Sequence, residues 1–223
     1  MKVKGNIMRI YILVVVSCIA LLQSIELKAE PVKTASINDL KELREAIDSI
    51  RLKSNTPGIA VGVFQADKDD WEYYSGLANI ENRQPINANS QFRFGSISKM
   101  FVSLAMLKLV DEGKVSLSDT LSSIAPEIEF SNPWEASHPI KIMHLLNHSS
   151  GWDSPHFVET RVLSNTPVQT IDALRLHPHS RMSRWQPGSR VAYNNTGFLA
   201  AAYVIEKVSG MAFERYIQVS FFN

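Results

Sequence analysis

The sequence predicts an α/β (α+β) domain in which helices pack on an antiparallel sheet. Two short β-rich runs joined by a polar turn indicate a hairpin, and several longer runs with apolar residues at helical spacing indicate helices. A two-stranded hairpin is only marginally stable alone, so it requires a helix layer or further strands. With 223 residues, of which 45% are hydrophobic, one domain is the expected organisation.

The first helix is predicted from Ser36 to about Lys53, where apolar residues recur at three- and four-residue steps. Ser36 or Asn38 is the expected N-cap. Pro57-Gly58 then ends the helix. The hairpin follows, with strands over residues 59–64 and 71–77.

A second helix is predicted from Ser96 to about Glu112, closed by Gly113. Its apolar spacing predicts one buried side, made of Met100, Phe101, Leu104, Leu107 and Val110. Further helices are expected over residues 140–147, 168–176 and 195–209, and residues 177–192 are expected to be loop.

The N-terminal segment is typical of a secretory signal peptide. Lys2, Lys4 and Arg9 precede an apolar run from Ile10 to Leu22, and Ala29 ends a plausible cleavage site. The run has about 13 residues, short of the roughly 20 that a spanning helix needs. We therefore predict a signal peptide over residues 1–29, a domain over residues 30–223, and a secreted or periplasmic protein. A membrane anchor is the alternative.

Cys18 is the chain's one cysteine. It either lies within the apolar part of the signal peptide or accepts a lipid as a lipoprotein cysteine. Cleavage after Ala29 would leave a mature chain without a thiol or a disulfide.

Ser96 and Lys99 form the first candidate catalytic pair. They are three residues apart and share a face on a helix, so the lysine can accept the serine proton or stabilise the alkoxide. The first helical turn also offers backbone N–H groups that favour an oxyanion. The alternative is that Ser96 is an N-cap and Lys99 a solvated lysine.

Three segments occur together and in a fixed order: "FRFGSISKMFVSLAMLKLVDEGKVSLSDTL" (92–121), "IKIMHLLNHSSGW" (140–152) and "WQPGSRVAYNNTGF" (185–198). The chain thereby resembles the serine beta-lactamase and penicillin-binding-protein superfamily, and more narrowly its class C-like branch. Ser96 and Lys99 match that branch's Ser-x-x-Lys motif, and Tyr193 and Asn195 match its Tyr-x-Asn motif. The resemblance implies a beta-lactamase/transpeptidase-like fold, with a helical lobe packed on an antiparallel sheet.

The resemblance also implies residue roles. Ser96 would be the nucleophile that accepts the acyl group, and Lys99 would activate it. Tyr193 would be the second general acid or base, and Asn195 would bind Lys99 or the substrate amide. Taken alone, "YNNTG" has another reading, in which Asn195 caps the following helix within a turn.

His144 and His148 have the i, i+4 spacing of a zinc pair. Leu145 stands where a metalloprotease has its glutamate, and no third ligand is apparent. The matching family segment is structural, so neither a metal nor a cofactor is predicted.

The chain departs from the family in one respect. Only 28 residues follow Asn195, whereas the family's third motif lies on a sheet strand roughly a hundred residues later. The expectation is a C-terminally truncated domain that lacks sheet strands and one oxyanion donor. Losing such a donor typically costs about 10² to 10³ in rate.

Two functions follow as hypotheses. The first is a serine hydrolase that acts through an acyl-enzyme on a beta-lactam, a D-Ala-D-Ala peptide or a carboxylic ester. The second is a catalytically incomplete fragment or a binding protein that retains the pocket. A small molecule or cell-wall peptide is the expected partner. With a formal charge of +1, nothing favours nucleic acid.

Overall fold

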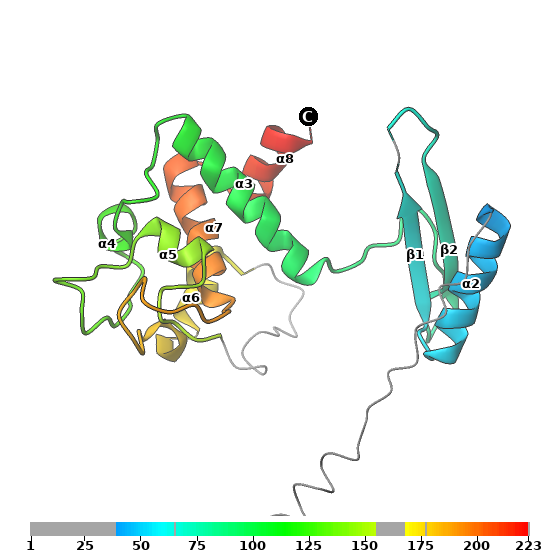
Figure 1. Ribbon diagram of the computed structural model, residues 1–223, viewed down its shortest axis with the longest axis horizontal. Helices are drawn as coiled ribbons and strands as arrows, with labels where there is room; N and C mark the ends of the chain where they lie inside the picture. Colours follow the sequence, from blue (N-terminus) through cyan, green and yellow to red (C-terminus); the bar gives the residue numbers. More distant parts are fainter. Residues whose placement is uncertain (1–38, 65, 155–167, 177, 223) are drawn as a thin grey trace, which may run out of the picture. The chain divides into compact units, whose positions relative to one another are not determined.

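The computed structural model describes residues 39–64, 66–154, 168–176 and 178–222 (Figure 1). The chain divides into two compact units, one ending at Gln91 and the other beginning at Phe92. The predicted signal peptide, Cys18 and the predicted caps Ser36 and Asn38 lie outside the described residues. Within the described ranges, no helix combines the length and apolar character needed to cross a membrane.

The first unit contains the predicted antiparallel hairpin. Strand β1 (Gly58–Val63) pairs with β2 (Trp71–Asn79), with Gly58 opposite Gly76 and Val63 opposite Trp71. A short strand β3 (Gln84–Pro85) pairs with the other edge of β2, which gives the sheet order β1-β2-β3. The sheet is therefore antiparallel, as predicted.

Helix α2 (Leu40–Lys53) supplies the helix layer of this small sheet. Asp48 on α2 accepts hydrogen bonds from two β2 hydroxyls, those of Tyr73 (2.7 Å) and Ser75. The Arg44 guanidinium lies 5.6 Å from the centre of the Tyr73 ring. Polar contacts and a cation–π contact thus join α2 to β2.

The predicted start of α2 was wrong. The helix begins at Leu40, and its N-cap is Asp39 rather than Ser36 or Asn38. The Asp39 carboxylate accepts hydrogen bonds of 2.8 Å from the backbone N–H groups of Lys41 and Glu42. A carboxylate satisfies two free donors and also complements the positive end of the helix dipole, so it defines the first turn.

The second unit is helical. Its helices are α3 (Ser98–Asp111), α4 (Leu121–Ile124), α5 (Ile142–Leu146), α6 (Thr170–Arg175), α7 (Thr196–Ser209) and α8 (Phe213–Phe221), with 3₁₀ turns at Gly95–Ile97 and Pro178–Arg181. The positions of α3, α5, α6 and α7 confirm the helices predicted there. Helices α4 and α8 were not predicted, and the 3₁₀ turn Pro178–Arg181 lies within residues 177–192, which were predicted to be loop.

Helix α7 is the centre of this unit and contacts α3, α5, α6 and α8. Small and branched side chains let its neighbours approach closely. Four residues of α7 have no exposed surface: Ala200, Ala201, Val204 and Ile205. The helix ends at Gly210, which adopts the left-handed conformation (φ 71°) common at helix C-termini.

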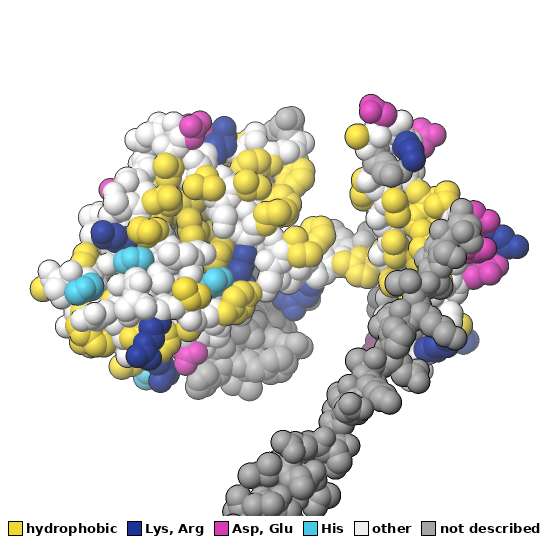
Figure 2. All heavy atoms as spheres, viewed as in Figure 1, with side chains coloured by type: hydrophobic (Ala, Val, Ile, Leu, Met, Phe, Trp, Pro, Cys, Tyr) yellow, Lys and Arg dark blue, Asp and Glu magenta, His cyan; other side chains and the backbone are white. Residues whose placement is uncertain are grey.

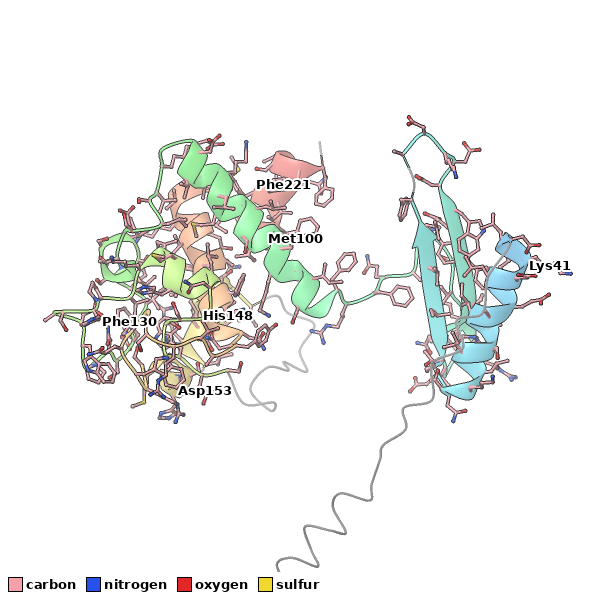
Figure 3. All side chains as sticks on the ribbon, viewed as in Figure 1. Lys41, Met100, Phe130, His148, Asp153 and Phe221 are labelled. Carbon is pink, nitrogen blue, oxygen red and sulfur yellow. The ribbon has the colours of Figure 1, made fainter. Side chains whose placement is uncertain are left out.

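The predicted buried side of α3 was wrong for three of its five residues; of the other two, Val110 packs partly buried against the core and Phe101 is half-buried. The buried residues are Val102, Ala105, Met106 and Leu109, whereas Met100 is 54% exposed. Leu104 and Leu107, also predicted to be buried, are 43% and 47% exposed. Figure 2 shows apolar side chains gathered on the surface of the unit that contains α3 and α8, and Figure 3 labels Met100 on α3.

The physical reason is that α3 is apolar around most of its circumference. Its sequence, SKMFVSLAMLKLVD, allows more than one apolar stripe at helical spacing. The small, fully buried Ala105 lets a neighbouring helix approach closely, so α3 packs on the side that contains Ala105, Met106 and Leu109.

Candidate active site

The candidate nucleophile lies on the turn that leads into α3. Ser96 is the middle residue of the 3₁₀ turn Gly95–Ile97, and its side chain is exposed. The residue at the N-cap position of α3 is Ile97, and no side chain caps the helix there. The interpretation of Ser96 as an N-cap is therefore wrong.

The Ser96 hydroxyl instead meets two groups of the predicted site. Its Oγ lies 2.5 Å from the phenolic oxygen of Tyr193, in a hydrogen bond in which either oxygen can donate. Lys99 Nζ donates to the same Oγ at 3.3 Å. Ser96 and Tyr193 are 97 positions apart in the sequence, and their hydroxyl groups form a hydrogen bond because α3 packs against α7.

Asn195 completes this group. Its Oδ1 accepts a hydrogen bond of 2.6 Å from Lys99 Nζ. Its backbone N–H donates to Ser154 Oγ at 3.1 Å. The side-chain amide of Asn195 and the hydroxyl of Ser96 therefore both accept hydrogen bonds from the Lys99 amine and hold it between them.

Asn195 occupies the N-cap position of α7, as the alternative interpretation expected, but its side chain makes no capping hydrogen bond. The neighbouring asparagine makes that bond instead. The fully buried Asn194 accepts a hydrogen bond of 2.8 Å from the Gly197 backbone N–H and donates to the Ala192 carbonyl at 3.1 Å. The side chain of Asn194 thus makes the hydrogen bond that caps α7, and the side chain of Asn195 accepts the hydrogen bond from Lys99.

The positive charge of Lys99 lies close to Tyr193 and affects the pKa of its phenol. Lys99 Nζ lies 4.8 Å from the centre of its ring. The interaction with Lys99 and the hydrogen bond with Ser96 together lower the pKa of the Tyr193 phenol below its ordinary value of 10.0. Lowering the pKa raises the fraction of Tyr193 that is ionised at neutral pH, and only the ionised phenol can accept a proton from Ser96.

The arrangement is suited to nucleophilic catalysis. An alkyl hydroxyl needs an adjacent base to become a nucleophile, and Ser96 has both a phenol and an amine within hydrogen-bonding reach. The roles of Ser96, Lys99, Tyr193 and Asn195 remain predictions, now with a shared geometry.

His148 is a neighbour of this group that the sequence reasoning did not assign to it. Its ring centre lies 4.5 Å from that of Tyr193 and 5.1 Å from that of Phe198. His148 is also one of the few non-glycine residues with a left-handed backbone, at φ 61°. A non-glycine residue in this region is a signal that only the structure gives.

The two histidines of the possible zinc pair are engaged elsewhere. Nδ1 of His144 accepts from the Lys141 backbone N–H at 3.1 Å, and Nδ1 of His148 accepts from the Asn194 backbone N–H at 3.3 Å. Among the described residues, no group of three or more His, Cys, Asp and Glu side chains is placed to hold a metal.

Comparison with known proteins assigns the family. The model of the family described as "Beta-lactamase" matches residues 40–223. The chain belongs to the beta-lactamase family. This confirms the resemblance carried by the three segments. The matched range contains all four candidate site residues, which are Ser96, Lys99, Tyr193 and Asn195.

Relatives of this beta-lactamase-family chain include penicillin-binding protein 4* of Bacillus subtilis, 27% identical over 193 residues, which span 83% of this chain and 40% of the relative. A beta-lactamase of Escherichia coli is 27% identical over 84% of this chain and 46% of its own length. A D-aminopeptidase of Gluconobacter oxydans is 25% identical over 81% of this chain and 33% of its own length. The chain spans less than half the length of these relatives.

Solved structures agree on the fold. An octameric penicillin-binding protein homologue from Pyrococcus abyssi is 30% identical, with a TM-score of 0.67 over 82% of this chain and 42% of that one. A D-amino acid amidase from Ochrobactrum anthropi is 22% identical, with a TM-score of 0.66 over 82% of this chain and 49% of the amidase chain. The predicted beta-lactamase/transpeptidase-like fold is confirmed.

Proposed function

We propose that this chain carries the nucleophile, base and lysine of a serine hydrolase that works through an acyl-enzyme. The observation that supports this most directly is the 2.5 Å contact between Ser96 Oγ and the Tyr193 phenol, with Lys99 Nζ 3.3 Å from the same Oγ. Membership of a family whose relatives include beta-lactamases and an aminopeptidase adds to it.

In the proposed reaction, Ser96 Oγ attacks the carbonyl carbon of an amide or ester. The hydroxyl proton passes to the Tyr193 oxygen, with Lys99 favouring the ionised phenol. The tetrahedral intermediate then expels its amine or alcohol, which takes the proton from Tyr193. Water attacks the acyl-enzyme in the same manner and restores the serine.

The proposed substrates are carbonyl compounds of the kinds that the relatives' names indicate: a beta-lactam, a D-Ala-D-Ala peptide or a D-amino acid amide, with carboxylic esters as a further class. A small molecule or a cell-wall peptide is the proposed partner. Secretion or periplasmic residence is part of the proposal and is supported by the N-terminal sequence pattern. Mass spectrometry of the mature N-terminus distinguishes cleavage after Ala29 from a lipid-anchored or membrane-anchored protein.

The test is covalent labelling with a fluorophosphonate probe and with a fluorescent penicillin. We expect both labels on the native chain and neither on Ser96→Ala or Lys99→Ala. Ser98→Ala and Lys108→Ala are matched controls, because they remove the same kinds of side chain from α3 outside the site, and we expect both to label normally.

A folded native chain that takes neither label would contradict the hydrolase. It would favour the alternative, a binding protein or catalytically incomplete chain that retains the pocket. Binding of a D-Ala-D-Ala peptide without its hydrolysis, measured by calorimetry and chromatography, would then establish that role.

A further inference from the structure

His148 forms hydrogen bonds with the two residues that flank Tyr193 in the sequence. Its carbonyl accepts a hydrogen bond of 2.9 Å from the Ala192 backbone N–H, and its Nδ1 accepts one of 3.3 Å from the Asn194 backbone N–H. The residues immediately before and after Tyr193 are therefore both attached to this one histidine.

The ring of His148 adds a third contact, to Tyr193 itself. The two ring centres are 4.5 Å apart and the planes are inclined by 38°, within the range of favourable aromatic pairs. The same histidine ring lies against Phe198, whose ring centre is 5.6 Å from Lys99 Nζ. His148 thus supports the phenol directly and contacts a ring that lies under the lysine.

The backbone at His148 is held in a conformation that costs energy. Its φ of 61° lies in the left-handed region, where a side chain with a Cβ is disfavoured. This conformation directs the carbonyl and Nδ1 of one residue toward two N–H groups that are two positions apart. Such strain persists where the surrounding contacts determine it.

We propose that His148 is a positioning residue for Tyr193, which sets the phenol against Ser96 and does so only while its Nδ1 is unprotonated. This deepens the proposed hydrolase and rests on it. A protonated Nδ1 carries a hydrogen and cannot accept from Asn194, so protonation removes one of the two backbone contacts that flank the tyrosine.

The charges around His148 oppose that protonation. Among the described residues, the titratable or charged groups found to interact with the His148 ring are Lys99 of α3 and Tyr193 of the segment before α7, and α7 contributes the uncharged ring of Phe198. Burial, and then the proximity of Lys99, lower the pKa of His148 below its ordinary value of 6.5. The neutral ring therefore persists through neutral pH, and the contact is lost only in acid.

Two substitutions separate the features of this residue. His148→Asn keeps an acceptor near the position of Nδ1 and tolerates the left-handed backbone, but has no ring. His148→Phe keeps a ring but has no acceptor. We expect His148→Phe to slow labelling of Ser96 about tenfold or more at pH 8, and His148→Asn to slow it less than about threefold.

The pH profile tests the role further. The labelling rate of the native chain is expected to fall below about pH 6.5 in a step assigned to His148. That step is expected to be absent in His148→Asn and to persist in His138→Asn, which removes an exposed histidine outside the site. A merely structural role for His148 would leave the step in place.

A readout independent of activity comes from carbon NMR of tyrosine labelled at Cζ, with Tyr193 assigned from Tyr193→Phe. We expect its pKa to stay lowered in His148→Asn and to return toward 10 in His148→Phe. Equal pKa values in the native chain and His148→Phe would overturn the proposal. So would equal losses in both variants, since the acceptor would then be irrelevant.

The native chain alone also decides the matter if His148→Phe does not fold. In that chain the Tyr193 signal is expected to shift as the His148 ring titrates, and a Tyr193 signal that ignores this titration would overturn the proposal. If no probe labels the native chain, the hydrolase fails, while these NMR measurements still establish or refute the positioning role.

Discussion

Asn195 Oδ1 accepts a hydrogen bond of 2.6 Å from Lys99 Nζ, while the preceding asparagine turns its amide into the protein interior. The structure therefore predicts opposite consequences for the same substitution at adjacent positions. One position affects the site, and the other affects the stability of α7.

Asn195→Ala is expected to slow the labelling of Ser96 about tenfold or more, because the lysine amine loses a charge-assisted hydrogen bond that fixes its position. Its free energy of unfolding is expected to remain within about 0.5 kcal/mol of the native value, since the side chain is exposed. Urea unfolding followed by tryptophan fluorescence measures this. Asn82→Ala, in a turn of the first unit, is the control for loss of an asparagine amide.

Asn194→Ala is expected to lower the free energy of unfolding by about 2 kcal/mol. The substitution leaves the buried Gly197 N–H without its acceptor and removes the donor to the Ala192 carbonyl. The same urea titration measures the loss. An unchanged unfolding midpoint in this variant would contradict the assignment of Asn194 as the cap.

Tyr193→Phe is expected to slow acylation of Ser96 by about 10² to 10⁴, the usual contribution of a general acid–base group. The ring and its contact with His148 are retained, so folding is expected to be unaffected. Rates of fluorophosphonate labelling measure the effect. A variant that labels as fast as the native chain would assign the proton transfer to Lys99 alone.

Glu127 joins two residues of α7 to the loop after α4. Its carboxylate accepts hydrogen bonds of 2.6 Å from Lys207 Nζ and the Tyr203 phenol. These bonds, with Lys207 the larger cause, lower the pKa of Glu127 from 4.5 to about 2. The pKa of Tyr203 is raised to about 12 by the same contact.

A carboxylate with a lowered pKa stabilises the fold above the unfolded value and loses that effect as pH falls through the folded value. Glu127→Gln is therefore expected to cost about 1 kcal/mol at pH 7, a modest amount because the pair is solvent-accessible. The difference from the native chain should shrink from pH 4.5 downward and vanish only below about pH 2. Urea unfolding at a series of pH values measures it, and Glu135→Gln is the control.

His144 predicts a second pH dependence. Burial, and then Lys141, lower the pKa of this buried histidine below 6.5. The unfolded chain thus binds a proton that the folded chain resists, so stability falls as pH drops below 6.5. His144→Asn keeps an acceptor for the Lys141 N–H and is expected to reduce this slope between pH 7 and 5. A slope equal to that of the native chain would contradict the role.

Local patterns were sufficient to predict the hairpin and the positions of helices α2, α3, α5, α6 and α7. The polar turn between two β-rich runs specified the hairpin, and Gly210 marked the end of α7. The four residues of the candidate site were predicted through the resemblance of their segments to a known family, since the local pattern alone also allowed Ser96 and Asn195 to be helix caps.

Tertiary contacts decided what the pattern left open. The buried side of α3 depends on which stripe fits α7, and hydrophobic spacing alone favoured the larger residues Met100 and Leu104. The capping role of Asn194 depends on where the amide of Asn195 finds a partner. The contact of His148 with Tyr193 joins loops 45 positions apart, and no local signal encodes it.

The long separation between Ser96 and Tyr193 has a kinetic consequence. Individual helices form in about a microsecond or less, whereas contacts between distant parts of the chain form more slowly, because a long loop must first close. The hydroxyl, phenol and amine come together only when α3 has docked on α7. Reactivity toward an acylating probe during refolding should therefore appear after helical circular dichroism, and the labelled fraction at any moment counts the molecules in which that docking is complete.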